Sequence, residues 1–239
     1  MTDIDEYNEK MKREKKYVSH TEMTDYNKLR VMNDVPYLNK VDYERTPLCE
    51  LAIEYHVDKC PENYHYYTPE YYKILKDFKP NKMLEIGIGY HEMMKNYAGQ
   101  EYQAGASLRM WRDFFNNETQ IYGCDIVEEC IFKEDNIETI ICNQSKPVEL
   151  EDMFKLIGNQ DLIIDDGSHI NQHQFLTFIT IWKYLNSGGI YIIEDLDKRI
   201  LEGIKTWEDL FDDATCIAHY SHEEDIQGFV CFQKTSSER

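Results

Sequence analysis

The sequence predicts an α/β fold built around a doubly wound, mostly parallel sheet with helices on both faces. Three observations lead to this prediction. Short apolar runs rich in isoleucine recur from residue 82 onward. Most of these runs are apolar on both alternations, which is typical of strands that are buried on both faces. Helix-like segments separate the runs, and this alternation of strand and helix is typical of a parallel sheet.

The expected elements follow one another along the chain. Two helices are expected within residues 48–79. The expected strands cover residues 82–89, 120–126, 138–143, 161–166, 189–196, 215–220 and 228–234. The expected helices between them cover residues 107–116, 147–158 and 170–186. Gly158 and the run Ser187-Gly188-Gly189 are expected to stop the last two of these helices.

Length and composition exclude several classes of protein. The chain has 239 residues and a net charge of −19, which argues against a general binder of nucleic acid or anionic membranes. It contains no apolar run of about 18 residues, and its first residues lack the apolar stretch of a secretory signal. The seven cysteines are scattered and never show C-x-x-C spacing. We therefore expect reduced thiols and a cytoplasmic protein.

The chain is expected to divide into an extension and one domain. Residues 1–46 are polar and form an N-terminal extension or arm, for which a solvated helix and a mobile arm are both open. The domain covers residues 47–239. Within the domain we expect a helical lead-in, a core that holds the site, and C-terminal strands. These three parts cover residues 47–80, 81–196 and 197–239.

Polar and acidic residues stand at the expected carboxyl ends of five strands. In an open α/β sheet, ligands bind beyond this edge. The residues concerned are Glu85, Gly87, Gly89, Asp125, Gln144, Asp165, Asp166, His169, Glu194 and Asp195. Several of the carboxylates leave a buried apolar strand directly, which favours a functional role over ordinary solvated loops.

The first two strand ends favour an adenosine cofactor without phosphates. Gly87 and Gly89 allow a ligand to approach the backbone closely. A dinucleotide fingerprint needs a third glycine at position 92, where this chain has Glu92, so an NAD-linked oxidoreductase is disfavoured. A carboxylate such as Asp125 accepts hydrogen bonds from both hydroxyls of a ribose. S-adenosylmethionine is the cofactor that best fits these features.

Three acids on two neighbouring strands suggest a metal site. Asp166, Glu194 and Asp195 are expected to lie together, and clustered carboxylates repel one another unless a cation or protons intervene. Carboxylate oxygens are the ligands that Mg²⁺ prefers. The alternatives are a solvated acidic rim, or an N-cap role for Asp166 or Ser168 at the helix that follows.

His169 is the candidate general base. It lies three residues after Asp166, where it can accept the proton of a hydroxyl whose pKa a metal has lowered. A capping histidine without chemistry is the alternative. A zinc site of His169 and His173 is disfavoured, because no third soft ligand follows.

The motifs EIGIG, SLRMWRDFF, IYGCDI, CNQS, DLIIDDGSH and GGIYIIEDL follow one another in this chain. In this order they resemble class I, metal-dependent O-methyltransferases of the macrocin O-methyltransferase type, with relatives near the cephalosporin-hydroxylase-like proteins. The resemblance covers roughly residues 48–196. Its most specific part is DDGSH, followed by Glu194-Asp195. The upstream pattern Tyr55-x-x-Asp58-Lys59 and the tyrosines after it are also similar.

The resemblance implies a Rossmann-like, seven-stranded methyltransferase sheet whose last strand is antiparallel. It implies Mg²⁺ on Asp166, Glu194 and Asp195, with His169 as the catalytic base. Asp165 is implied as a cofactor contact or an alternative metal ligand. The other implied contacts of S-adenosylmethionine are Glu85, Gly87, Gly89, Ser107, Asp125 and Gln144.

The expected activity is the methylation of a hydroxyl on a sugar or glycoside, with Mg²⁺ binding two neighbouring hydroxyls of the acceptor. A catechol-like O-methyltransferase and a non-catalytic domain that binds the cofactor or a glycan are the alternatives. Segment 90–106 is longer than usual for the family, so we expect it to form a lid. The expected partner is a small-molecule or glycan acceptor, with no nucleic acid and no membrane. A homo-oligomer is expected by analogy alone.

Overall fold

The computed structural model of this protein describes residues 2–14, 43–221 and 227–235. Within these residues, eight strands form one sheet in the order β3-β4-β2-β1-β5-β6-β8-β7. The strands are β1 (Lys82–Ile86), β2 (Gln120–Asp125), β3 (Lys133–Glu134), β4 (Ile137–Ile141), β5 (Gln160–Asp165), β6 (Leu185–Asp197), β7 (Ala214–Ser221) and β8 (Gln227–Lys234). Neighbouring strands from β4 to β6 pair in parallel. The predicted α/β class with a mostly parallel sheet is confirmed.

The predicted number of seven strands is wrong. The two residues of β3 pair antiparallel with the start of β4 and add an eighth strand at the edge of the sheet. A strand of this length contains no apolar run, so hydrophobic periodicity does not detect it. The last strand, β8, is antiparallel to both β6 and β7, as predicted.

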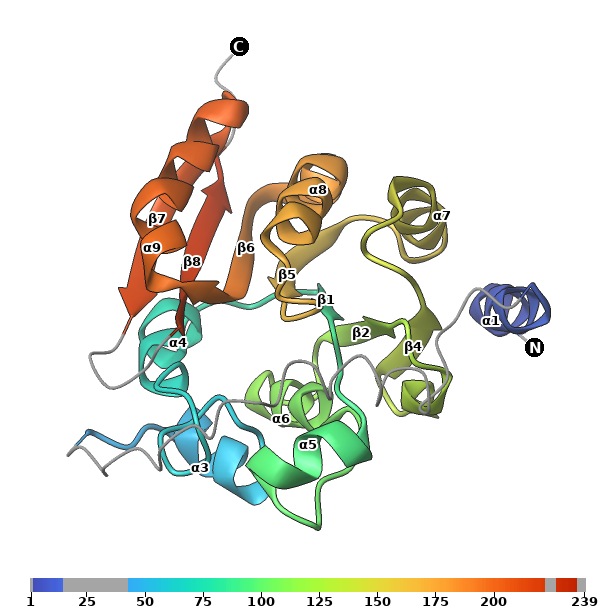
Figure 1. Cartoon of the computed structure of the whole chain (residues 1–239), viewed down its shortest axis with the longest axis horizontal. Coiled ribbons are helices and arrows are strands. Elements are labelled where there is room, and N and C mark those ends of the chain that lie inside the picture. The colour runs from blue at the N-terminus through green and yellow to red at the C-terminus, as the bar shows by residue number, and fades with distance from the viewer. Residues whose placement is uncertain (1, 15–42, 222–226, 236–239) are drawn as a thin grey trace.

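Helices cover both faces of the sheet (Figure 1). On one face, α3 (Pro47–Glu54), α4 (Thr68–Leu75) and α6 (Ala106–Phe114) pack in the first hydrophobic core. On the other face, α7 (Pro147–Ile157), α8 (Asn171–Ile181) and α9 (Lys198–Ile204) pack in the second core. Two further helices complete the described fold. α5 (His91–Ala98) follows β1 in the chain, and α1 (Asp3–Arg13) lies beside β4 at the edge of the sheet.

The central strands contribute side chains to both cores in alternation. On β5, Leu162 and Ile164 belong to the first core, whereas Ile163 belongs to the second. Ile192 and Ile193 of β6 divide in the same way. This explains why these parts of β5 and β6 are apolar at successive positions, because each face of the sheet needs its own layer of apolar side chains.

The helix predicted over residues 170–186 is shorter than expected. α8 ends at Ile181, and a 3₁₀ turn leads to Leu185, where β6 begins. Leu185 already pairs with Gln160, and the register shifts before the next pair of strand residues. Ser187-Gly188-Gly189 therefore lie inside β6 and do not stop the helix. Gly158 does end α7, with a φ of +69°.

Part of the predicted N-terminal arm is a helix packed against the sheet. Thr2 and Asp5 form a capping box at the start of α1. The buried Asn8 side chain donates to Thr139 O at 3.0 Å and accepts from Ile141 N at 2.9 Å. The Asn8 side chain thus pairs with the part of β4 that follows the residues paired with β3, where the backbone groups of an edge strand would otherwise lack partners. The rest of the arm, residues 15–42, lies outside the described residues.

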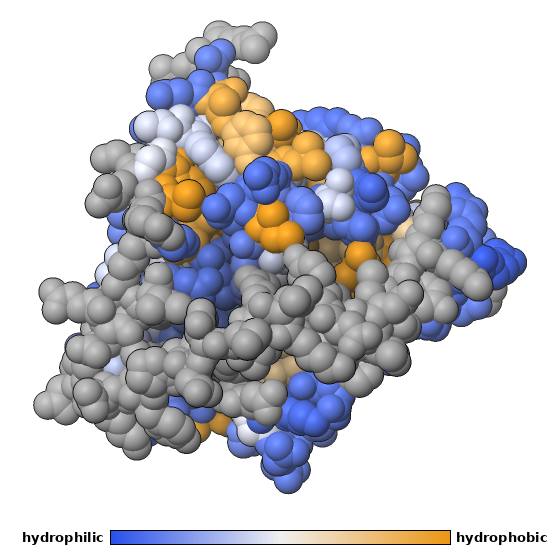
Figure 2. Space-filling model, in the orientation of Figure 1, coloured by the Kyte–Doolittle hydropathy of each residue, from blue (hydrophilic) through white to orange (hydrophobic). Residues whose placement is uncertain are grey.

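Of the surface that is coloured in Figure 2, most is hydrophilic, and apolar surface gathers around the positions of α8 and α9. Phe175 and Ile179 are the exposed apolar side chains of α8. Among the residues that the structure describes, no helix combines the length and the apolar character that a bilayer span requires.

Candidate active site

The carboxyl ends of the parallel strands border a cavity of about 460 Å³. This volume falls within the range of ligand pockets, about 300–1,000 Å³. Five of the residues predicted to contact the cofactor line it: Gly87, Gly89, Ser107, Asp125 and Gln144. Asp166 and His169 line it as well. The structure therefore brings predicted cofactor positions and predicted catalytic positions to one cavity.

Gly87 lies where the chain leaving β1 crosses the end of β5. Its φ is +83°, and a Cβ atom at this position would lie 2.1 Å from the carbonyl oxygen of Asp166. In the same crossing, Asp166 N donates to Ile86 O at 2.9 Å. Only glycine fits here, so Gly87 allows the close approach of the two backbones by which Ile86 O holds Asp166 N.

Asp125 is held in place by backbone amides at the end of β2. Its Oδ2 accepts from Ile88 N at 3.1 Å, and its Oδ1 accepts from Val127 N at 2.9 Å. Burial raises the pKa of this carboxyl group, and the amides oppose that rise. Asp125 also lines the cavity, so its carboxylate stands beside the space that a ligand would occupy.

Glu85 and Asp165 were also predicted as cofactor contacts, but both are fully buried and neither is among the residues that line the cavity. Ser107 Oγ donates to Glu85 at 2.7 Å, and Gln144 Nε2 donates to Asp165 at 2.9 Å. Burial raises the pKa of both carboxyl groups to about 7. The side chains of Glu85 and Asp165 thus point into the interior, and each one is in contact with a residue that lines the cavity, Ser107 or Gln144.

Lys59 connects the acids of the neighbouring strands. Its Nζ lies 2.5 Å from Asp166 Oδ2, 2.7 Å from Glu194 Oε2 and 3.6 Å from Glu85 Oε1. Burial disfavours the charge of the ammonium, but the three carboxylates outweigh it and hold the pKa of Lys59 well above its usual value. Lys59 in turn helps to lower the pKa of Asp166 to about 2, against the effect of burial.

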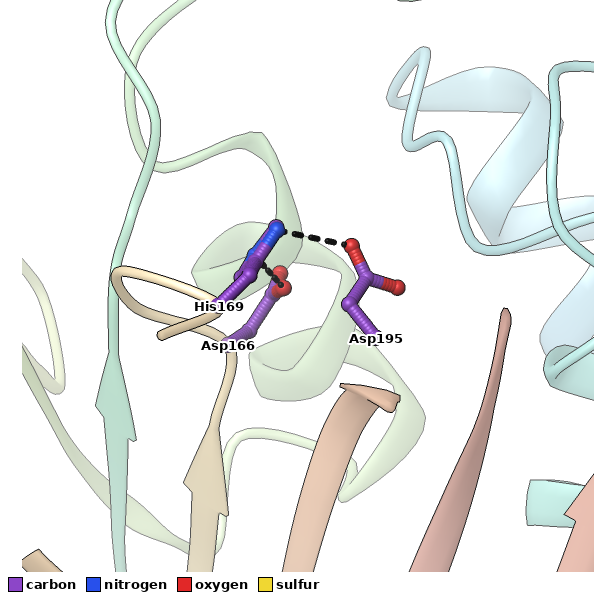
Figure 3. A group of neighbouring side chains, drawn as sticks. All are labelled: Asp166, His169 and Asp195. Atoms are coloured by element: carbon purple, nitrogen blue, oxygen red, sulfur yellow. Dashed lines mark hydrogen bonds and ion pairs between the residues drawn. The ribbon is translucent and has the colours of Figure 1, made fainter. Parts of the chain in front are cut away.

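His169 lies between two carboxylates (Figure 3). Its Nε2 is 3.1 Å from Asp166 Oδ1, and its Nδ1 is 3.1 Å from Asp195 Oδ2. His169 and Asp195 both have positive φ angles, 53° and 55°. Strained backbone of this kind concentrates at functional sites. Tyr67 OH donates to Asp195 Oδ1 at 2.8 Å, and His65 Nε2 lies 3.3 Å from the same oxygen.

The predicted metal ligands are neighbours, but they divide into two groups among the described residues. Glu85, Asp166 and Glu194 form one group, and Asp166, His169 and Asp195 form the other. In each group the ligand atoms lie within 4.8 Å of one another. Carboxylate oxygens suit Mg²⁺, and Glu194 Oε1 is buried without a hydrogen-bond partner among these residues. The donor set therefore fits the expected ion.

None of Asp166, Ser168 and His169 is the N-cap residue of the helix that follows, although Ser168 Oγ accepts from Ile170 N at 3.4 Å just before it. α8 begins at Asn171, and its N-cap residue, Ile170, makes no side-chain cap hydrogen bond. Segment 90–106 contains α5, whose Met93 and Met94 line the cavity. Its role as a lid stays a prediction.

Sequence reasoning assigned no role to Lys59, His65 or Tyr67, although all three contact the acids. They come from the segment between α3 and α4, which lacks a periodic pattern. Lys59 is separated from Asp166 by 107 positions. The available signal was the Asp58-Lys59 pattern and the tyrosines that follow it, which the family resemblance pointed out.

Comparison with known proteins agrees with this geometry. No family model matches the chain. The chain is 35% identical over 151 residues to 8-demethyl-8-alpha-L-rhamnosyl tetracenomycin-C 2'-O-methyltransferase of Streptomyces olivaceus, which covers 62% of this chain and 37% of that protein. It is 37% identical over 134 residues to demethylmacrocin O-methyltransferase of Streptomyces fradiae, which covers 55% of this chain and 32% of that protein. The chain thus spans less than two fifths of the length of these relatives.

A solved structure extends the similarity to the fold. The MycE methyltransferase of the mycinamycin biosynthetic pathway, in complex with Mg, SAH and mycinamycin VI, matches with a TM-score of 0.66 and 26% identity. The match covers 82% of this chain and 56% of MycE. The predicted resemblance to sugar O-methyltransferases of the macrocin type is therefore confirmed, both in sequence and in fold.

Proposed function

We propose that this chain is an S-adenosylmethionine-dependent O-methyltransferase that uses Mg²⁺ and methylates a hydroxyl of a sugar or glycoside. One observation carries the proposal. Asp166 and His169 line the cavity at the strand ends and, at the same time, contact the acid cluster that extends to Asp195 and, through Lys59, to Glu194. The similarity to sugar O-methyltransferases, including MycE with Mg and SAH bound, supports it.

In this proposal, the adenosyl cofactor occupies the cavity beside Gly87, Gly89, Asp125 and Gln144. Asp125 accepts hydrogen bonds from the ribose hydroxyls, since backbone amides already orient its carboxylate. Glu85 and Asp165 support the cofactor site indirectly. Their buried carboxyl groups accept hydrogen bonds from Ser107 and Gln144 and so orient these two side chains, which line the cavity.

Asp166, Glu194 and Asp195 would hold the Mg²⁺. When bound, the ion lowers the pKa of an acceptor hydroxyl, and the sulfonium of the cofactor supplies an electrophilic methyl group. Each ring nitrogen of His169 faces a carboxylate oxygen at 3.1 Å. His169 would therefore accept the hydroxyl proton at the nitrogen that its carboxylate leaves on turning to the ion, and the other carboxylate would stabilise the resulting imidazolium. These acids and His169 would also orient the acceptor hydroxyl in line with the methyl group, and such orientation contributes much of the rate enhancement.

The test combines a binding measurement with turnover. A thermal melt with S-adenosylhomocysteine should show a higher melting temperature, because the ligand binds the folded chain. Methyl transfer from labelled S-adenosylmethionine to a glycoside with neighbouring hydroxyls should stop with EDTA and return with Mg²⁺. The same glycoside with one of the two hydroxyls removed serves as the control acceptor.

Three outcomes would contradict the proposal at different points. Turnover that survives EDTA unchanged would remove the metal from the mechanism. Turnover of a catechol without turnover of any glycoside would favour the catechol-type activity. Binding of S-adenosylhomocysteine without transfer to either acceptor would favour a non-catalytic domain.

A further inference from the structure

The Lys59 ammonium fills the centre of one of the two acid groups. Its Nζ lies 2.5 Å from Asp166 Oδ2 and 2.7 Å from Glu194 Oε2, and the Lys59 side chain is only 2% exposed. Glu85 completes the group at 3.6 Å from Nζ. One oxygen of each acid lies within 4.8 Å of the others, which is a spacing that a divalent ion can bridge. A cation of the chain itself therefore stands where three carboxylates converge.

Asp166 and Glu194 each contact Lys59 through one carboxylate oxygen. Asp166 Oδ1 lies 3.1 Å from His169 Nε2. Glu194 Oε1 is buried and has no hydrogen-bond partner among the described residues. The oxygens that Asp166 and Glu194 turn toward a common point are thus the ones that hold Lys59. A divalent ion bound by both carboxylates at that point needs the same two atoms.

Lysine and a divalent ion cannot share these oxygens at low cost. Mg²⁺ requires its oxygen ligands at about 2.0–2.1 Å. An ammonium that still bonded to the same oxygens would lie within a few ångströms of the ion, where like charges in a buried site repel strongly. Binding of the ion to Asp166 and Glu194 and retention of Lys59 on them are therefore competing states.

We propose that Lys59 is a built-in competitor of the divalent ion: its ammonium holds Asp166 and Glu194 together when no metal is bound, and it leaves both carboxylates when Mg²⁺ binds. The inference rests on the proposed function, from which it takes the ion. It adds that the chain carries its own replacement cation, so that the buried acids stay neutralised without metal and the affinity for Mg²⁺ is reduced.

The surroundings of Lys59 allow this exchange by movement of the side chain alone. The backbone of Lys59 is fixed, because its carbonyl accepts from Tyr67 N at 3.1 Å and from Thr68 N at 3.0 Å. The side chain borders the cavity of about 460 Å³, as does the neighbouring Asp58. A displaced ammonium therefore has open space beside it and a carboxylate close to its own backbone.

The first experiment measures Mg²⁺ binding by calorimetry in the wild-type chain and in Lys59→Met, which keeps the length of the side chain and removes its charge. We expect Lys59→Met to bind Mg²⁺ about tenfold more tightly or better, because a nearby positive charge no longer opposes the ion. The melting temperature without metal should fall, and the rise on adding Mg²⁺ should exceed that of the wild type. Lys183→Met is the matched control, because Lys183 is 58% exposed and pairs with Glu151 on the surface.

A second measurement uses the wild-type chain, so it holds even where Lys59→Met fails to fold. Brief acetylation with acetic anhydride, followed by mass spectrometry, reports how accessible the Lys59 amine is. We expect saturating Mg²⁺ to increase acetylation of Lys59 severalfold, while acetylation of Lys183 stays unchanged. In Asp166→Asn the dependence of Lys59 labelling on Mg²⁺ should disappear.

The outcomes separate this inference from the proposed function. If the wild type binds Mg²⁺, but Lys59→Met binds it no more tightly and Lys59 labelling ignores the ion, the competition is refuted while the metal-dependent activity stands. If the wild type shows no binding of Mg²⁺ at all, the metal in the proposed function is refuted together with it. A folded Lys59→Met with weaker Mg²⁺ binding would likewise overturn the inference, since it would make Lys59 a helper of the ion.

Discussion

Asp165 and Asp166 are consecutive residues at the carboxyl end of β5, yet their carboxyl groups are in opposite electrostatic states. Asp165 is fully buried, and its burial raises the pKa to about 7 although Gln144 donates a hydrogen bond to it. Burial opposes the charge of Asp166 as well, but Lys59 and His169 outweigh it and lower the pKa to about 2. The two states differ because, of these two acids, Asp166 is the one with the Lys59 ammonium at hydrogen-bond distance.

The role of each acid therefore depends mainly on the partner that contacts it, and only in part on the strand that carries it. Asp165 accepts from an amide and lies beneath the cavity, where it supports Gln144. Asp166 borders the cavity and contacts both Lys59 and His169. The same residue type thus serves as a support at one position and as a candidate ligand at the next.

The largest effect is expected from Asp166→Asn, which removes the member that both acid groups share. We expect methyl transfer to fall by at least about a thousandfold, because a neutral amide stabilises neither the ion nor a protonated His169. Calorimetry should show that Mg²⁺ binding is lost as well. Asp152→Asn on the exposed side of α7 is the control. Retention of more than a tenth of the activity would show that Asp166 is not a ligand.

His169→Ala comes next, because it removes the proton acceptor and leaves the carboxylates in place. We expect initial rates to fall by about a hundredfold to ten-thousandfold, the usual contribution of a general base. Mg²⁺ binding should stay within a few-fold of the wild type, in contrast to Asp166→Asn. His219→Ala on the exposed face of β7 is the control. A parallel loss of Mg²⁺ binding would instead make His169 a ligand.

Asn8→Ala extends the comparison to an uncharged buried group that does not line the cavity. The change leaves Thr139 O and Ile141 N without the partner that Asn8 provides. We expect the free energy of unfolding to fall by about 1–3 kcal/mol, the cost of unsatisfied buried polar groups. Urea denaturation measures it, with the exposed Lys10→Ala as the control. Equal stability of the two variants would mean that α1 does not hold the edge of β4 in solution.

The smallest effect is expected from Asp165→Asn. Asp165 Oδ2 has no hydrogen-bond partner among the described residues, so the amide loses little there, and Oδ1 can still accept from Gln144. We expect a change in stability of less than about 1 kcal/mol below pH 3.8, where the carboxyl group is mostly protonated in both the folded and the unfolded chain. A marked rise of the KM for S-adenosylmethionine would instead support direct contact between Asp165 and the cofactor.

The pH dependence of stability, compared between the wild type and Asp165→Asn, tests the raised pKa of Asp165. The pKa of Asp165 rises from 3.8 to about 7 on folding, so its contribution to stability is complete below pH 3.8 and is lost as the pH rises through 7. The wild type should therefore lose stability relative to Asp165→Asn over that range. Urea denaturation at several pH values measures the difference, and a constant difference would contradict the raised pKa.

Much of the site was predictable from the strands. Asp125, Asp166 and Glu194 follow short runs that are apolar on both alternations, and the direction of parallel strands brings their carboxyl ends to one edge. Other features left no periodic signal. The two residues of β3 are too short to show one, and the pairing of Asn8 with the edge of β4 joins parts of the chain that are more than 130 positions apart.

The α/β class, the positions of the buried strands along the chain and the edge at which the acids gather were predictable from the amino-acid sequence alone, because they follow from local periodicity and strand direction. Tertiary structure decided which acids face the cavity and which lie beneath it. It also brought Lys59 to Asp166 and Glu194, across 107 and 135 positions. The charge state of a buried carboxyl group depends on such distant partners, and only the packed chain supplies them.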